Sequence, residues 1–562
     1  MRFAYGIAFT LFLAAPLGAP AFAAEPDAPQ TLISRNEAIR IAIQERLSQK
    51  FTKASEQQLN AQGALVEYYS VPEQRLLWVD ETGITPRGKA VMEEVARVDD
   101  YGLRASDYEL PSADAVKADD VNNLADAEIK ISYAVAEYAR DARGGRIDPS
   151  SISKNLDPSM ALPNSLEVIE SIAIRSDAAA YLRSFQPDQP QFEALRQKLI
   201  ELRGGKTEPV KEKEIVQIPD GPVLRLGIKH EQVVLLRKRL EVPLEAGDGI
   251  QPDETIFDDS VDQAVRQFQT AHGVGPDGLV GPGTRRMMNQ PNSARHEAAS
   301  PAKIRTVLLN MERWRWLPHD LGAFYVMVNV PEFMLRVVKE GETIHTSRVV
   351  VGKTDKQTPI FSNEMQTIVF NPYWNVPNSI KVEEIKPYVR AESGWLFGGG
   401  GWNTSVLQRH NLRIKVGGRE VDPGSIDWNR IDVRSLHMYQ PPGPDNVLGY
   451  VKFVFPNKHD VYMHDTPQKF LFAKAVRAES HGCMRVQNPD QLAQVLLNYD
   501  QGWTASRVAS SIANSYDQNV GLKQKIPVYV TYFTADVDVN GSLATRADLY
   551  GHDARMAAAL RL

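Results

Sequence analysis

The sequence has 562 residues. A single hydrophobic core stops growing beyond about 250–300 residues, so we expect about three domains. The net charge is −6 and the isoelectric point is near 6.1. No block of Lys and Arg stands out, which argues against nucleic acid as a partner because binding it needs a basic surface.

The N-terminus, MRFAYGIAFTLFLAAPLGAPAFAAEP, begins with a positive charge and continues with an apolar run. The run ends in Ala21-Phe22-Ala23, a small-x-small cleavage pattern. It is shorter than the roughly 20 residues of a membrane-spanning helix. We therefore predict a signal peptide over residues 1–23 and an exported protein, with a retained N-terminal anchor as the alternative.

Residues 24–220 are predicted to form a mainly helical scaffold domain that ends in a charged linker. Apolar residues recur at three- and four-residue spacing over 35–49, 88–102 and 128–145. The second and third of these segments end in glycine, a common helix stop. Charged residues and prolines over 204–222 are typical of a linker. No catalytic constellation is visible in this part of the sequence.

A compact helical unit is predicted over residues 221–290, followed by a polar linker over 291–303. Its middle helix, within DDSVDQAVRQFQTAHG, is expected to begin at the N-cap Ser260 and to end at Gly273. Pro282 is expected to open the next helix. The buried stripe of the middle helix is predicted to contain Val261, Ala264, Val265 and Phe268.

From residue 304 the sequence changes to short runs that are rich in β-formers and broken by Pro, Gly and Asn. This pattern predicts an antiparallel sheet domain over 304–538, with a short C-terminal segment over 539–562. A Gly-rich and polar stretch over 398–444 is predicted to be an inserted loop. Its four glycines lie between Trp395 and Trp402, and we expect a mobile lid there.

Cys483, in the stretch SHGCMRV, is the only cysteine of the chain. A lone cysteine cannot form an intramolecular disulfide. A free cysteine is often a small buried hydrophobe, but oxidising compartments disfavour stray thiols. We therefore favour a nucleophile over a packing residue.

The neighbours of this cysteine predict a loop or short strand at the edge of a cleft. Val451, Phe453 and Phe455 alternate, and an extended run resumes from Val461 to His464. Tyr462 and His464 should share one face of that run. After the cysteine, a helix is expected with N-cap Asn488, Pro489 at its first position and a buried stripe of Leu492, Val495, Leu496 and Tyr499.

Two histidines could act as the base that takes the thiol proton. We favour His464, at a strand end, over His481, which could be only a local hydrogen-bonding residue. Gly482 permits a tight backbone in which successive N–H groups converge as an oxyanion hole. Ser480 and Arg485 could hold the loop or bind a substrate carboxylate, and Arg485 could equally be an internal salt-bridge partner.

Several motifs resemble those of known cell-wall proteins. The positions from Val223 to Asn289, with LRLG, AVRQFQTAHG and DGLVGPGT, resemble a three-helix peptidoglycan-binding domain. YMHDTP followed by SHGCMRV resembles the catalytic signature of the L,D-transpeptidase family of peptidoglycan cross-linking enzymes, with its YkuD-type catalytic domain. LNMERWRW, VVVGKTDKQTPIF, NPYWNVPNSI, PGPDNVLGYVKFVFPN and PVYVTYFTADVD extend the match. The whole arrangement is similar to the large periplasmic members of Gram-negative bacteria.

The resemblance implies a multidomain α+β protein and a set of residue roles. Cys483 would be the nucleophile and His464 the base. The oxyanion or substrate-binding residues would be Gly482, His481, Tyr462, Ser480, Arg485 and Trp374. In the family a backbone carbonyl can orient the catalytic histidine, and the sequence leaves open whether the side chain or the backbone of Asp465 contributes here.

The reaction implied is the formation of 3→3 cross-links between peptidoglycan tetrapeptide stems through a cysteine thioester, with release of D-Ala. No metal or organic cofactor would be needed, and other cell-wall synthesis enzymes are conceivable partners. An L,D-carboxypeptidase with water as acceptor would use the same site. A non-catalytic peptidoglycan-binding scaffold is the alternative from another class. A papain-like enzyme fits less well, because its cysteine precedes its histidine in the chain.

Overall fold

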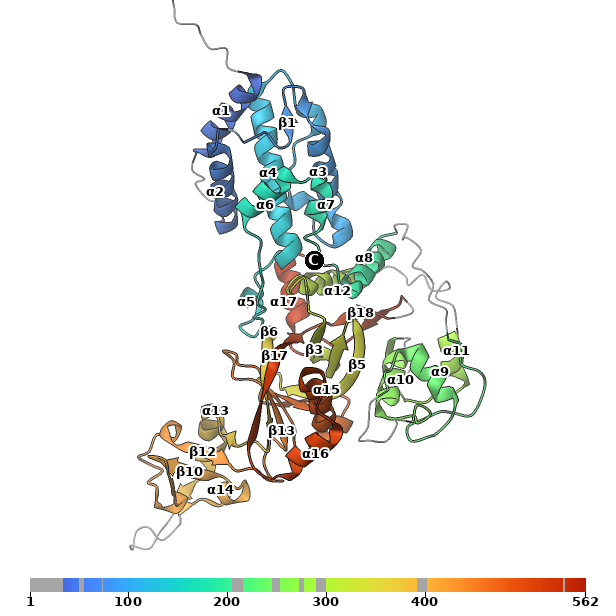
Figure 1. Cartoon of the computed structure of the whole chain (residues 1–562), viewed down its shortest axis with the longest axis vertical. Coiled ribbons are helices and arrows are strands. Elements are labelled where there is room, and N and C mark those ends of the chain that lie inside the picture. Colours follow the sequence, from blue (N-terminus) through green and yellow to red (C-terminus); the bar gives the residue numbers. More distant parts are fainter. Residues whose placement is uncertain are drawn as a thin grey trace, which may run out of the picture.

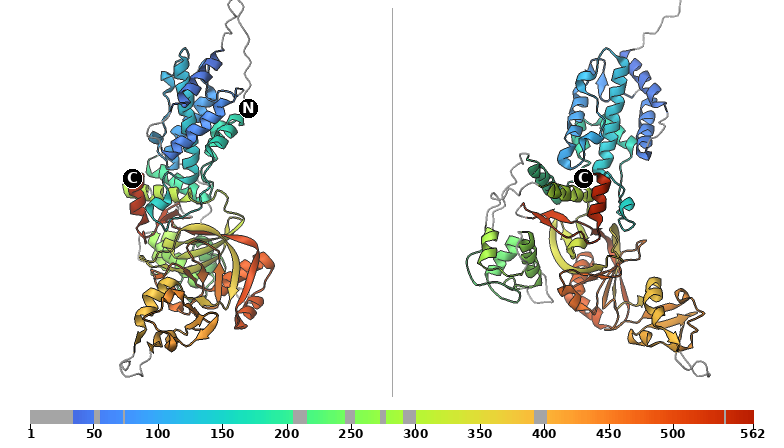
Figure 2. Two further views of the ribbon diagram at one scale, coloured as in Figure 1. Left: turned by 90° about the vertical axis from the view of Figure 1, so that its left-hand side faces the viewer. Right: turned by 180° about the vertical axis from the view of Figure 1, so that it is seen from behind.

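The structure is a computed structural model that describes residues 34–49, 55–72, 74–204, 216–244, 253–271, 277–289, 300–391, 402–538 and 541–562. A helical domain, a central β-rich domain, a small inserted subdomain and a separate small helical domain are distinct in Figure 1. The helical domain and the inserted subdomain lie at opposite ends of the β-rich domain in all views (Figure 2). No helix in the described ranges is long and apolar enough to cross a membrane. The predicted signal peptide lies outside them.

The N-terminal domain is a helical bundle, as the apolar spacing predicts. The predicted helix over 88–102 is shorter than expected: it ends at Ala96, and a 3₁₀ turn leads to Gly102, whose φ of +73° stops the segment. The long helix ends before Gly145. The helices of the bundle are α1 (Arg35–Leu47), α2 (Glu56–Ser70), α3 (Pro86–Ala96), α4 (Val121–Gly144), α6 (Ser165–Ile174) and α7 (Ala178–Arg183).

A second core joins this bundle to the β-rich domain. Helix α8 (Pro190–Leu202) packs against α12 (Pro301–Trp314), and both contribute apolar side chains to a core shared with Tyr529 and Phe533. Helix α12 begins inside the predicted linker over 291–303, because Ser300 accepts the Lys303 N–H as its N-cap and Pro301 occupies the first position. The linker prediction is therefore wrong from Pro301 onward.

The small helical domain contains α9 (Gln232–Leu240), α10 (Asp259–Ala271) and α11 (Pro282–Asn289) around its own core. The predicted stripe of α10 is confirmed for Val261, Val265 and Phe268, which are buried, whereas Ala264 is half-buried. Helix α10 begins one residue before Ser260, and Asp258 Oδ1 accepts the Val261 N–H in place of the predicted cap. Pro282 opens α11 as predicted. Gly273 lies outside the described residues.

Nine strands of the described chain form one sheet in the order β15-β5-β16-β14-β13-β6-β17-β3-β4. An additional pairing joins β4, at one end of this order, to β5, the second strand from the other end, so the sheet closes on itself like a barrel. The prediction of an antiparallel sheet is only partly right, because β14–β16, β15–β5 and β17–β3 are parallel. The strands are β3 (Phe324–Asn329), β4 (Met334–Lys339), β5 (Glu342–Gly352), β6 (Phe361–Phe370), β13 (Val451–Val454), β14 (Met463–His464), β15 (Ala478–Ser480), β16 (Met484–Val486) and β17 (Gln518–Thr531).

Helices α15 (Pro489–Gln501), α16 (Ala505–Ala513) and α17 (His552–Leu560) contribute to or flank the main core. In α15, Leu492 and Leu496 are buried as predicted, and Val495 is half-buried. Tyr499 is 41% exposed, and its ring stacks flat on that of Phe324 with centroids 3.7 Å apart. The prediction that Tyr499 belongs to the buried stripe is therefore wrong. Asn488 stands at the N-cap in a left-handed conformation, but its side chain makes no capping bond.

Residues 402–444 of the predicted inserted loop belong to a folded subdomain. It has its own core, which includes Trp374, Leu407, Ile414, Trp428 and Met438. A sheet of β7 (Trp374–Asn375), β10 (Arg413–Val416), β11 (Arg419–Val421) and β12 (His437–Gln440) supports that core. Residues 402–444 are therefore a folded unit and not a simple loop, while their role as a lid stays a prediction. Trp395 and the four glycines lie outside the described residues.

Candidate active site

Two neighbouring parallel strands bring the candidate residues together. In the register of β14 and β16, Met463 lies opposite Met484 and His464 opposite Arg485. The Met484 N–H donates to the Tyr462 carbonyl at 3.1 Å, which places Cys483 beside Tyr462. Residues two apart in a strand share a face. Tyr462, His464, Cys483 and Arg485 therefore face the same side, as the sequence predicts for the first two.

The His464 ring is held by the main chain. Its Nδ1 lies 2.5 Å from the carbonyl oxygen of Asp465. A carbonyl can only accept, so Nδ1 carries the proton and Nε2 keeps a lone pair. Burial, helped by the positive charge of Arg485, lowers the pKa of His464 to about 3. The ring is therefore neutral at pH 7, which is the state that a general base requires.

The bond from His464 Nδ1 to the Asp465 carbonyl shows that the backbone of Asp465, and not its side chain, orients the histidine. Its side chain has a different task. The carboxylate accepts the N–H of Tyr450 at 3.0 Å and that of Thr466 at 2.6 Å, and it also contacts the Lys469 ammonium. Asp465 thereby ties the carbonyl that holds His464 to the start of β13 and to the residues that follow it in the chain.

Cys483 is half-buried at the end of the loop that precedes β16. Burial raises the pKa of the Cys483 thiol, while contacts with Tyr462 and the charges of Lys452 and Arg485 oppose the shift. The net direction is upward, so the thiol is protonated at neutral pH. Attack on a carbonyl then requires removal of the proton by a neighbouring base, since the thiolate is the nucleophile.

This arrangement predicts the pH dependence of thiol reactivity. The rate of Cys483 alkylation by iodoacetamide should rise with pH, with a midpoint above the ordinary thiol value of about 8.5, because only the thiolate reacts. Lys452→Met should move the midpoint further up, since the ammonium favours the thiolate. Lys523→Met, at an exposed position outside the site, is the matched control. A midpoint below 8.5 in the unmodified protein would contradict the prediction.

Tyr462 forms one wall of the site. Its ring lies edge-on to the His464 ring with centroids 5.7 Å apart, and the Lys452 Nζ lies 3.8 Å from its centroid. Burial raises the pKa of Tyr462 well above its usual value, so the hydroxyl stays protonated. That hydroxyl interacts with both Cys483 and the Trp374 indole. Trp374, which is buried in the inserted subdomain's core, thus reaches the site through Tyr462.

Ser480 and Gly482 shape the loop of residues 480–483, which we call the nucleophile loop after the role predicted for Cys483. Ser480 Oγ donates to the Cys483 carbonyl at 2.5 Å and accepts the Gly482 N–H at 3.1 Å. Gly482 has a φ of +114°, which only glycine adopts without strain. Because its N–H is already engaged, Gly482 offers no free donor to a substrate in this structure. Among the described residues, none accepts a hydrogen bond from the Cys483 N–H.

His481 and Arg485 take different positions. His481 is exposed, and its Nε2 lies 2.5 Å from a carboxylate oxygen of Glu384 in the inserted subdomain. The Arg485 guanidinium donates to Gln468 at 2.6 Å. Thus Arg485 contributes charge to the site, whereas His481 connects the nucleophile loop to the subdomain.

Sequence reasoning missed Lys452, Thr358 and Glu384. Strand alternation could have found Lys452, because it lies between the buried Val451 and Phe453 and therefore faces the other side. It is paired in register with His464. Thr358, whose hydroxyl donates to the Gly482 carbonyl, and Glu384, which contacts His481, are remote in sequence from Cys483, and no local pattern signals these contacts.

Comparison with family models identifies three of the domains described above. Residues 323–512 match the L,D-transpeptidase catalytic domain, and residues 63–199 match a scaffold domain. Residues 229–288 match a family described as "Putative peptidoglycan binding domain". The chain thus contains a YkuD-type L,D-transpeptidase catalytic domain and a peptidoglycan-binding domain in a multidomain α+β architecture. The sequence-based resemblance is confirmed at this level.

One curated relative, from Haemophilus influenzae, is named "Putative L,D-transpeptidase" and is 33% identical over 246 residues. The match covers 44% of this chain and 47% of the relative, so it spans about half of that protein's length. An L,D-transpeptidase from Xylanimonas cellulosilytica is 14% identical and covers 56% of this chain and 98% of its own, with a TM-score of 0.23. A fused Zn-dependent amidase, peptidase and peptidoglycan-binding protein from Clostridium acetobutylicum is 14% identical. That match covers 55% of this chain and 99% of the other, with a TM-score of 0.14.

Proposed function

We propose that the protein is an L,D-transpeptidase that forms 3→3 cross-links between peptidoglycan stems. The proposal rests on a half-buried protonated thiol, Cys483, placed on one face with the neutral and oriented imidazole of His464. These two groups lie in a domain of the L,D-transpeptidase family. Cys483 and His464 are therefore assigned as nucleophile and general base.

The proposed reaction has two acyl-transfer steps. His464 Nε2 removes the thiol proton, and the sulfur attacks the carbonyl of the stem's third residue. The amide bond to D-Ala breaks, D-Ala leaves with the proton returned by His464, and a thioester remains. The side-chain amine of an acceptor stem then attacks the thioester, gives up a proton and restores the free thiol.

Charges around the site favour both steps. Lys452 and Arg485 both interact with the Cys483 sulfur. They would stabilise the thiolate on which attack depends. The Cys483 N–H is the donor best suited to the developing oxyanion, since the Gly482 N–H is occupied by Ser480.

We assign the other domains to placement on the wall. The domain of α9 to α11 would bind peptidoglycan, and Arg348 of β5 connects it to the catalytic domain by a 2.8 Å hydrogen bond to Gln263. The helical scaffold could position other cell-wall synthesis enzymes. The N-terminal pattern and these domains together support a periplasmic location.

Mass spectrometry of the products from disaccharide-tetrapeptide tests the assignment. Dimers linked between two third residues, together with free D-Ala, are expected. Tripeptide without dimer would favour the L,D-carboxypeptidase. An unreacted substrate together with retained binding to sacculi would favour the non-catalytic scaffold.

The inserted subdomain is proposed to cover the donor site and to shield the thioester from water. Besides the His481–Glu384 contact, Glu383 accepts from Lys356 at 2.8 Å, so two ion pairs join this subdomain to the site's surroundings. Exposed pairs of this kind contribute only modestly to stability, because solvent screens them. The double variant E383Q/E384Q should therefore raise the ratio of tripeptide to dimer about two- to ten-fold while leaving iodoacetamide alkylation unchanged.

Arg413→Gln is the matched control, since Arg413 pairs with Glu420 inside the same subdomain, where both side chains are 50% exposed. An unchanged product ratio in E383Q/E384Q would refute the covering role. A shift of equal size in the control would do the same.

A further inference from the structure

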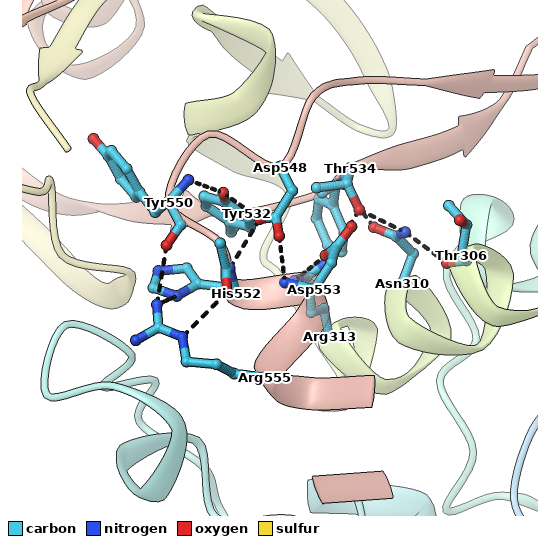
Figure 3. Close-up of polar contacts among 12 residues, drawn as sticks. Thr306, Asn310, Arg313, Tyr532, Thr534, Asp548, Tyr550, His552, Asp553 and Arg555 are labelled. Carbon is cyan, nitrogen blue, oxygen red and sulfur yellow. Dashed lines mark hydrogen bonds and ion pairs between the residues drawn. The ribbon is translucent and has the colours of Figure 1, made fainter. Parts of the chain in front are cut away.

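The segment after the matched catalytic domain contains a buried polar network. Tyr532, Asp548, Tyr550 and His552 lie together beside the start of α17 (Figure 3). Tyr532 donates from its hydroxyl to Asp548 at 2.8 Å and accepts the backbone N–H of Tyr550 at 2.6 Å. Asp548 also accepts the N–H groups of His552 and Asp553, both at 2.9 Å, at the first turn of α17. The network therefore fixes the backbone at Tyr550.

The Tyr550 side chain leaves this network and reaches the sheet. Its hydroxyl donates to the Gly352 carbonyl at 2.7 Å and accepts the Thr358 N–H at 3.2 Å. Burial raises the pKa of Tyr550 to about 12, so the hydroxyl keeps the proton that it donates. The Tyr550 ring stacks on Tyr532 at 5.7 Å, which limits its movement.

Thr358 connects this network to the nucleophile loop. The side chain of Thr358 is fully buried, and its hydroxyl accepts the Gly352 N–H at 2.9 Å and donates to the Gly482 carbonyl at 2.8 Å. Gly352 cannot carry a side chain, because a Cβ there would lie 2.1 Å from the Lys356 carbonyl oxygen. The turn between Gly352 and Thr358 is therefore tightly defined.

The Gly482 carbonyl and the Cys483 N–H belong to one peptide unit. That unit is planar and trans, so the two groups point in opposite directions. Holding the carbonyl oxygen consequently fixes the direction of the N–H. The Cys483 N–H has no acceptor among the described residues and is therefore available to a bound carbonyl.

We propose that Tyr550 and Thr358 are positioning residues that aim the Cys483 N–H at the oxyanion formed during acylation. The inference rests on the proposed role of Cys483 as the nucleophile. It adds the C-terminal segment, which lies beyond residues 323–512, to the parts of the chain that complete the site. The two residues act through Gly482 and touch no reacting atom.

The test compares two reactions of the same thiol. Acylation by p-nitrophenyl acetate passes through a tetrahedral oxyanion, whereas alkylation by iodoacetamide does not. Tyr550→Phe and Thr358→Val should each slow acylation about 10- to 100-fold, since misplacing one oxyanion donor costs rates of this order. Alkylation should be unchanged, and so should the pH midpoint of alkylation. Thr358→Ser keeps the hydroxyl and should restore acylation to within about two-fold of the unmodified protein.

Tyr529→Phe is the matched control, because it also removes one buried hydroxyl that donates to a carbonyl, that of Leu321 at 3.0 Å. It should change neither rate. Equal losses of acylation and alkylation in Tyr550→Phe and Thr358→Val, or no loss of acylation, would overturn the proposal. If Tyr550→Phe does not fold, the contrast between Thr358→Val and Thr358→Ser decides.

The ester keeps this test separate from the proposed substrate. A protein that is acylated by the ester but not by disaccharide-tetrapeptide would contradict the proposed transpeptidase function. The acylation-to-alkylation ratios of the variants would still decide the positioning role.

Discussion

Cys483→Ala should abolish the formation of 3→3 dimers, of tripeptide and of the covalent acyl-enzyme, because no other cysteine exists in the chain to form the thioester. We expect a loss to the uncatalysed background, at least about 10⁴-fold. The measurement is product analysis by mass spectrometry, with the mass of the intact protein read for the acyl adduct.

The fold should survive this substitution, since Cys483 is a small, half-buried residue in a loop. An unchanged circular dichroism spectrum and a melting temperature within a few degrees would establish that. Binding to isolated sacculi should also persist, because the proposed binding domain lies elsewhere. Dimer formation by the folded variant at more than a trace level would remove Cys483 as the nucleophile.

His464→Ala should slow acylation about 10²- to 10⁴-fold, the range usual for loss of a general base. The reason is geometric: the ring is buried, and its Nδ1 faces the Asp465 carbonyl, which leaves Nε2 as the proton acceptor. His481→Ala should slow acylation less than about ten-fold, since His481 is exposed and pairs with Glu384. Single-turnover acylation, followed by the mass of the acyl-enzyme, separates the two.

Tyr462→Phe is expected to fall between these variants. It keeps the ring that lies edge-on to His464 but removes the hydroxyl that interacts with the thiol. A larger defect in His481→Ala than in His464→Ala would reverse the assignment of the base. Equal defects in both would mean that the loop, rather than a proton acceptor, had been damaged.

The predictions that the fold and the family comparisons confirm came from local sequence patterns. Apolar spacing located α1 and α4 because a helix repeats every 3.6 residues whatever it packs against. Strand alternation placed Tyr462 and His464 on one face for the same local reason, the two-residue period. The motif around Cys483 identified the catalytic domain, since its residues are contiguous in the chain.

Errors arose where remote contacts decide. Tyr499 has the spacing of a buried residue, but it stacks on the rim of the core against Phe324. Residues 301–303 continue the small and polar stretch of the predicted linker, yet Ser300 and Pro301 start a helix there. The insertion is rich in Gly and polar residues, but it folds because Trp374, outside the stretch, shares its core.

By itself the sequence determined the nucleophile loop, the histidine on the neighbouring strand, the helical scaffold and the small helical domain, because each is encoded by neighbouring residues. Only the tertiary structure decided the parallel pairing of β14 with β16 and the choice of the Asp465 carbonyl as the group that orients His464. It also decided the link from Tyr550 through Thr358 to Gly482. Tyr550 lies 198 residues from its partner Gly352, and Thr358 lies 124 residues from its partner Gly482. Such contacts depend on how the chain closes long loops, and the free energy that selects them comes from packing the whole core rather than from any local propensity.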